Sequence, residues 1–102
     1  HVVDLAKAHV SALKAIDDNC GLEIYNVGTG RGYSVLEVVK AFEKANDLKV
    51  PYTIQPRRSG DITECYCNPQ KIEKELGWKA ENDLEDMCRD SWNWQKNNPN
   101  GY

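Results

Sequence analysis

The sequence predicts a small mixed α+β domain with about four helices and three short strands. The chain has 102 residues, a length that allows one domain with a single hydrophobic core. Four stretches carry apolar residues at helical spacing, each near residues that favour a helix end. Three shorter apolar or alternating runs lie between turn residues, which is the pattern of strands.

The first half of the chain is expected to contain two helices and one strand. Asp4 is placed to cap a first helix, which should end near residues 17–19, just before Gly21. The apolar run over residues 22–27 predicts a strand, and a glycine-rich loop follows at residues 28–32. Ser34 and Glu37 have the spacing of a capping box, which predicts the start of a second helix.

The second half is expected to contain two strands followed by two helices. Residues 50–54 and 62–67 predict strands on either side of a turn at residues 56–60. Asn68 is an expected N-cap with Pro69 in the first turn of a third helix, which should end at Gly77. The last helix should follow Asp83 and stop before Pro99.

Composition excludes several classes of function. The net charge is −3, and such an acidic chain is a poor binder of nucleic acid. No apolar run approaches the roughly 18 residues that a membrane span requires. The cysteines lack a C-x-x-C pair, so no metal site is expected and we expect reduced, mostly buried thiols; they are Cys20, Cys65, Cys67 and Cys88. The expected compartment is the cytoplasm.

The glycine-rich segment lies between an expected strand and an expected helix, where a dinucleotide fingerprint would lie. Its spacing is Gly28-x-Gly30-x-Gly32, and the position of the third fingerprint glycine is Tyr33. A phosphate at the N-terminus of the following helix stays an alternative. The favoured interpretation is a connector that lets the loop and the helix pack closely.

The stretch from Arg57 to Asp61 has the clearest chemical content. Arg58 offers a planar fork of donors for phosphate oxygens, and Gly60 permits a tight turn that could bring Asp61 back beside it. A carboxylate accepts hydrogen bonds and suits a pair of hydroxyls such as a ribose diol. Spacing alone favours a solvated turn with a local ion pair, and a two-point grip on a nucleotide diphosphate is the alternative.

Several motifs occur in an order and spacing that resemble a known family. They are residues 1–6 (HVVDLA), 24–30 (IYNVGTG), 34–35 (SV), 57–61 (RRSGD), 68–69 (NP), 76–78 (LGW) and 92–95 (WNWQ). With these motifs the whole chain is similar to the C-terminal third of the UDP-galactose 4-epimerases, which are extended short-chain dehydrogenase/reductases. Some of the motifs also occur in sister dehydratases and decarboxylases.

The resemblance implies one part of an NAD-dependent enzyme that interconverts UDP-galactose and UDP-glucose through a 4-keto intermediate. In the family an N-terminal Rossmann domain binds NAD, and a Tyr-x-x-x-Lys pair with a Ser or Thr moves protons. This sequence contains neither element, so residues 1–102 are expected to be the UDP-sugar-binding portion, without catalytic residues and inactive alone. The implied parent is a cytoplasmic homodimer that binds neither nucleic acid nor membrane.

The resemblance also implies roles for individual residues. Arg58 would hold the diphosphate, with Gly60 shaping its turn, and Asp61 would accept from the ribose hydroxyls. Val35 would border the uridine. Cys65 would border the sugar, where a small residue accompanies acceptance of N-acetylhexosamines; expected strand alternation puts it on the face of Asp61. A thiol without a role in specificity stays the alternative for Cys65.

Two other classes of function stay open. The chain could be a non-catalytic nucleotide-sugar-binding module. It could also be a protein-interaction domain that keeps the fold and uses Trp92 and Trp94 as exposed anchors, although core packing is the favoured interpretation for Trp92.

Overall fold

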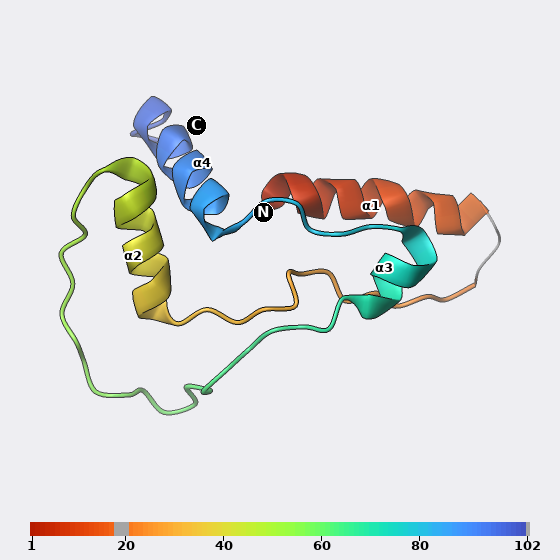
Figure 1. The fold of residues 1–102 in the computed structure, drawn as a ribbon, viewed down its shortest axis with the longest axis horizontal. Coiled ribbons are helices and arrows are strands. Elements are labelled where there is room, and N and C mark those ends of the chain that lie inside the picture. The colour runs from red at the N-terminus through yellow and green to blue at the C-terminus, as the bar shows by residue number, and fades with distance from the viewer. Residues whose placement is uncertain (18–20, 102) are drawn as a thin grey trace. The chain divides into compact units, whose positions relative to one another are not determined.

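The structure is a computed structural model that describes residues 1–17 and 21–101. Its described part contains four helices, drawn in Figure 1: α1 (Val2–Asp17), α2 (Val35–Asn46), α3 (Gln70–Leu76) and α4 (Leu84–Asn97). The chain divides into two compact units. The first comprises residues 1–32 and 66–82, with α1 and α3, and the second comprises residues 33–65 and 83–102, with α2 and α4.

The expected strands are absent from the described residues, so the prediction of an α+β fold with three strands was wrong. Residues 22–27, 50–54 and 62–67 form no ladder, and Figure 1 draws the chain between α2 and α3 as a coil without arrows. A strand exists only when its main-chain groups pair with a second segment. A local pattern of apolar residues identifies extended chain, and it cannot supply that partner.

Three helix ends follow the local sequence signals: the starts of α2 and α4 and the end of α3. At the start of α2, the Ser34 hydroxyl accepts from the Glu37 amide at 3.2 Å and the Ser34 amide donates to the Glu37 carboxylate at 2.7 Å. Asp83 and Asp86 form the same reciprocal pair at the start of α4. Gly77 ends α3 in the left-handed conformation with φ of 64°, as its position predicted.

The N-terminal helix begins earlier than expected, because Asp4 does not cap it. The helix starts at Val2, and the His1 ring nitrogen Nδ1 accepts from the Val3 amide at 3.1 Å. Asp4 lies inside the first turn and is only 2% exposed. The prediction of an Asp4 cap was therefore wrong.

Asp4 instead connects α1 to the segment after α3, which lies more than 70 residues away in the sequence. Its carboxylate accepts from the main-chain amides of Glu81 (3.2 Å) and Asn82 (2.9 Å) and from the Asn82 side-chain amide (2.8 Å). The Trp78 indole donates to the Asp4 carbonyl at 3.0 Å. Burial alone would raise the pKa of Asp4, but the hydrogen bonds from Asn82 and Glu81 outweigh it and hold that pKa below its usual value.

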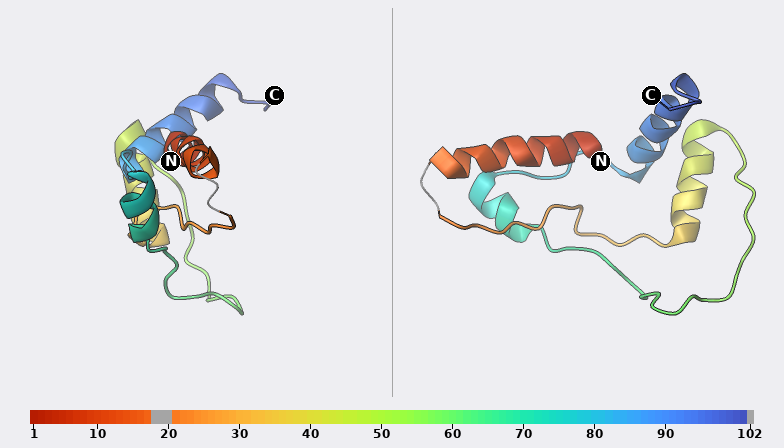
Figure 2. Two further views of the ribbon diagram at one scale, coloured as in Figure 1. Left: turned by 90° about the vertical axis from the view of Figure 1, so that its right-hand side faces the viewer. Right: turned by 180° about the vertical axis from the view of Figure 1, so that it is seen from behind.

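The core of the first unit forms where α1, α3 and the segment after α3 meet. Ala8, Ile72 and Trp78 are buried together, and Tyr25, Leu76 and Ala80 pack against them. The neighbouring positions of α1 and α3 can be followed in Figures 1 and 2. This core accounts for the Leu-Gly-Trp motif, because Gly77 turns the chain so that Trp78 reaches α1.

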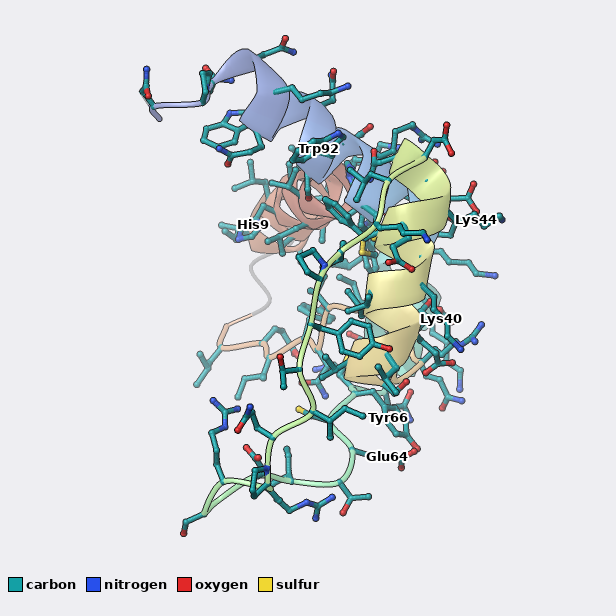
Figure 3. All side chains as sticks on the ribbon, turned by 90° about the vertical axis from the view of Figure 1, so that its left-hand side faces the viewer. His9, Lys40, Lys44, Glu64, Tyr66 and Trp92 are labelled. Carbon is teal, nitrogen blue, oxygen red and sulfur yellow. The ribbon has the colours of Figure 1, made fainter. Side chains whose placement is uncertain are left out.

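The second unit contains the α2–α4 pair, and its described contacts include an aromatic pair, a hydrogen bond and an ion pair between the two helices. Phe42 and Trp92 pack edge to face with ring centroids 5.9 Å apart, which agrees with the expected packing role of Trp92. The Asn46 side chain donates to the Cys88 carbonyl at 3.2 Å. Lys44, labelled in Figure 3, pairs with Glu85 at 2.6 Å. No described helix is both long and apolar enough to cross a membrane.

Candidate nucleotide-sugar site

The predicted Arg58–Asp61 pair is present on a tight turn of the second unit. The Arg58 amide donates to Asp61 Oδ2 at 2.9 Å, and the Asp61 amide donates back to the Arg58 carbonyl at 3.3 Å. The Arg58 guanidinium Nη2 lies 3.2 Å from Asp61 Oδ1. Gly60 has φ of +88°, a conformation that side chains other than glycine rarely adopt. Gly60 therefore permits the turn that brings Asp61 back to Arg58.

This turn presents two complementary groups to solvent. The Arg58 side chain is 87% exposed and the Asp61 side chain is 35% exposed, so both are open to a ligand. A guanidinium binds two oxygens of a phosphate or carboxylate, whereas an ionised carboxylate only accepts hydrogen bonds. The pair can thus receive a ligand that carries an anionic group and, a short distance away, hydroxyl donors.

Val35 and Cys65 belong to the same unit as this turn. Val35 is the first residue of α2 and is 80% exposed, and Cys65 is an exposed free thiol on the chain before α3. Five residues were predicted to form the site. Of the described hydrogen bonds and ion pairs, the ones that connect two of these five residues all run between Arg58 and Asp61. Since no strand forms at residues 62–67, alternation cannot place Cys65 beside Asp61, and that argument was wrong.

Protein atoms pack closely against the glycine-rich segment of residues 28–32. A Cβ on Gly28 would lie 2.6 Å from Cys67 Sγ, and one on Gly32 would lie 3.3 Å from the Tyr66 ring. A Cβ on Gly30 would lie 3.3 Å from Pro69 Cδ. These glycines allow residues 66–69, the chain just before α3, to pack against the loop, whereas the sequence led us to expect close packing between the loop and a helix.

The cysteines differ in environment more than the sequence indicated. Cys88 is buried, and burial together with the nearby Glu85 carboxylate raises the pKa of its thiol. Cys67 is half-buried against Gly28 and Cys65 is exposed, so the expectation of mostly buried thiols was wrong in part. Cys20 lies outside the described residues. In the part of the chain that the structure describes, no three His, Cys, Asp or Glu side chains gather as metal ligands.

Comparison with known proteins identifies relatives along the whole chain. The family model described as GDP-mannose 4,6 dehydratase matches residues 2–91. The UDP-glucose 4-epimerase of Haemophilus influenzae is 60% identical over 102 residues, which are 100% of this chain and 30% of that protein. The UDP-glucose 4-epimerase of Homo sapiens is 54% identical over 102 residues, 100% of this chain and 29% of that protein.

Solved structures show the same similarity. The UDP-glucose 4-epimerase of Bifidobacterium longum, crystallised in complex with NAD+ and UDP, is 58% identical with a TM-score of 0.87; the match covers 100% of this chain and 30% of that one. The enzyme of Stenotrophomonas maltophila, with bound NAD and formylated UDP-arabinopyranose, is 48% identical with a TM-score of 0.91. That match covers 95% of this chain and 29% of the other.

These similarities confirm the resemblance inferred from the motifs. UDP-galactose 4-epimerase and UDP-glucose 4-epimerase are two names for the same activity, each taken from one of its two substrates. The chain spans about 30% of the length of the curated relatives it matches, in their C-terminal portion. The family model matches nearly all of the sequence, and the chain therefore belongs to the family described as GDP-mannose 4,6 dehydratase.

Proposed function

We propose that residues 1–102 are the UDP-sugar-binding portion of an enzyme that interconverts UDP-galactose and UDP-glucose. The observation that carries the proposal is the exposed Arg58–Asp61 turn, which offers a cation and an acceptor 3.2 Å apart. It is supported by relatives whose names are UDP-glucose 4-epimerase, one of them crystallised with NAD+ and UDP.

Each predicted site residue has a role in this proposal. Arg58 binds the diphosphate on the turn that Gly60 permits, and Asp61 accepts from the ribose hydroxyls. Val35 contacts the uridine, and Cys65 lies beside the sugar. Binding at the nucleotide end anchors the substrate and leaves the sugar free to present either face to the reacting groups.

The rest of the proposed enzyme lies outside this chain. NAD, which accepts and returns a hydride in such a reaction, is assigned to an N-terminal Rossmann domain, because the glycine-rich loop here is occupied by Cys67, Pro69 and Tyr66. We further propose that the complete protein is a cytoplasmic homodimer that also converts the N-acetylhexosamine pair.

The test is an assay of the complete protein with UDP-galactose, with the sugar nucleotides resolved by NMR. We expect UDP-glucose as the product, and no turnover by the 102-residue chain alone. The matching family model is described as a dehydratase, and such an activity would instead give a 4-keto-6-deoxy sugar nucleotide. That product, or no reaction, would contradict the proposal.

A further inference from the structure

A cavity of about 510 Å³ lies inside the second unit, between the C-terminal end of α2 and residues 89–96 of α4. Cavities of about 300–1,000 Å³ are the usual size for sites that bind small molecules. The end of α2 is held beside α4, because the Asn46 side chain donates to the Cys88 carbonyl at 3.2 Å. Asp47, which also lines the cavity, ends α2 in the left-handed conformation with φ of 50°. The two helices therefore form two opposing walls of the cavity.

Two of the cations that line this cavity, Lys44 and Arg89, already have carboxylate partners. Lys44, labelled in Figure 3, pairs with Glu85 at 2.6 Å. Arg89 pairs with Asp86, and its Nε lies 3.7 Å from Asp90 Oδ1. Because these carboxylates offset the charge of both cations, the cavity has little attraction for an anionic ligand.

The other polar groups of the lining offer hydrogen-bond donors and acceptors together. Asp47 only accepts hydrogen bonds and Lys96 only donates them, and their two charges cancel. Neither residue takes part in the ion pairs described for residues 1–17 and 21–101. The amide of Asn93, which also lines the cavity, both donates and accepts. A hydroxyl group does the same, so a neutral ligand with several hydroxyls suits all three side chains.

Trp92 supplies an apolar part of the lining. Its ring packs edge to face with Phe42, with the centroids 5.9 Å apart, and the residue stays only half-buried. An indole ring offers a broad apolar surface together with an N–H donor. The ring of a sugar has a matching combination, because its C–H groups form an apolar face and its hydroxyls project from the edge.

We propose that this cavity between α2 and α4 is a binding site for a neutral, hydroxyl-rich ligand of the size of a mono- or disaccharide. The proposal does not depend on the Arg58–Asp61 turn. We expect the cavity to stay accessible in the complete protein, since its lining carries exposed charged side chains that are costly to bury; they include Arg89, Asp90 and Lys96. The same exposure makes binding weak, and a monosaccharide should bind with a Kd of about 1–10 mM.

The experiment titrates methyl β-galactopyranoside into the complete protein labelled with fluorinated tryptophan, with the resonances followed by fluorine NMR. The Trp92 resonance is assigned with Trp92→Phe, and saturating UDP-glucose fills the proposed substrate site throughout. We expect a saturable shift of the Trp92 resonance with a Kd of about 1–10 mM. The resonance of Trp78, which lies in the first unit, should not move. Sodium phosphate at matched ionic strength should leave the Trp92 resonance in place.

The helix α4 offers a matched pair of variants for the same titration. Asn93 lines the cavity, whereas Gln95 is exposed on the same helix and is not among the lining residues. Asn93→Ala should weaken sugar binding about two- to tenfold through the loss of a hydrogen bond, and Gln95→Ala should leave it unchanged. No saturable shift of Trp92 by the sugar, a shift by phosphate in its place, or equal affinities for Asn93→Ala and Gln95→Ala would overturn the inference.

Discussion

Replacing Asp4 by alanine should strongly destabilise the first unit. The side chain is 2% exposed, and its carboxylate accepts three hydrogen bonds, from the Glu81 and Asn82 amides and the Asn82 side chain. Removing a charged acceptor leaves these donors without a partner, and each such loss costs about 1–3 kcal/mol when water cannot reach the group. Water can hydrogen-bond to the half-buried Asn82 and so reduce this cost. We therefore expect the free energy of unfolding to fall by about 3 kcal/mol in total.

The assay is urea unfolding of the complete protein, followed by tryptophan fluorescence because Trp78 donates to the Asp4 carbonyl. Asp4→Asn should be milder, since its one oxygen can keep the two main-chain amides while a rotated Asn82 side chain accepts from its new NH2. Glu73→Ala, on the exposed part of α3, is the matched control and should change stability by less than about 0.5 kcal/mol. Equal stabilities for Asp4→Ala and Glu73→Ala would refute the reasoning.

Three further outcomes are expected. The pKa of Asp4 is lower in the folded state than its usual value, so its contribution to stability is present above about pH 4 and is lost in stronger acid. Urea midpoints should therefore fall less steeply with acid for Asp4→Ala than for wild type, and parallel falls would contradict this. Gly28→Ala should lower the free energy of unfolding by about 1–3 kcal/mol, because its methyl would lie 2.6 Å from Cys67 Sγ. Adding Cys67→Ala should restore part of the lost melting temperature. No recovery in the double variant would exclude that contact as the cause. Cys65→Tyr should slow turnover of the N-acetylhexosamine pair more than that of UDP-galactose, and assays showing equal slowing would leave Cys65 without a role in specificity.

Features that depend on neighbours in sequence could be predicted from the sequence. The capping pairs at Ser34 and Asp83 involve residues three positions apart, and Gly77 needs only its own left-handed conformation. The Arg58–Asp61 ion pair is equally local, because Gly60 folds the chain back within three residues. Physical rules for one turn of chain are sufficient at all these positions.

Several features that depend on distant partners could not be predicted. Asp4 is a residue type that often caps helices and lies near the start of one. Its carboxylate nevertheless accepts hydrogen bonds from main-chain amides 77 and 78 residues further along the chain. The expected strands failed for a related reason, since an extended apolar run says nothing about whether a second strand lies beside it. In the candidate site, the same limit applies to Cys65, whose placement relied on a strand that the described chain does not form.

The central claim is that Arg58 on its turn binds the diphosphate of a UDP-sugar. Titration calorimetry of UDP against the complete wild-type protein, Arg58→Ala and Arg57→Ala tests it directly. A charge-assisted phosphate contact contributes about 1.5–3 kcal/mol, so Arg58→Ala should weaken UDP binding by roughly ten- to a hundredfold. Arg57→Ala, which removes the adjacent charge, should change it far less. Equal UDP affinities for wild type and Arg58→Ala would contradict the account.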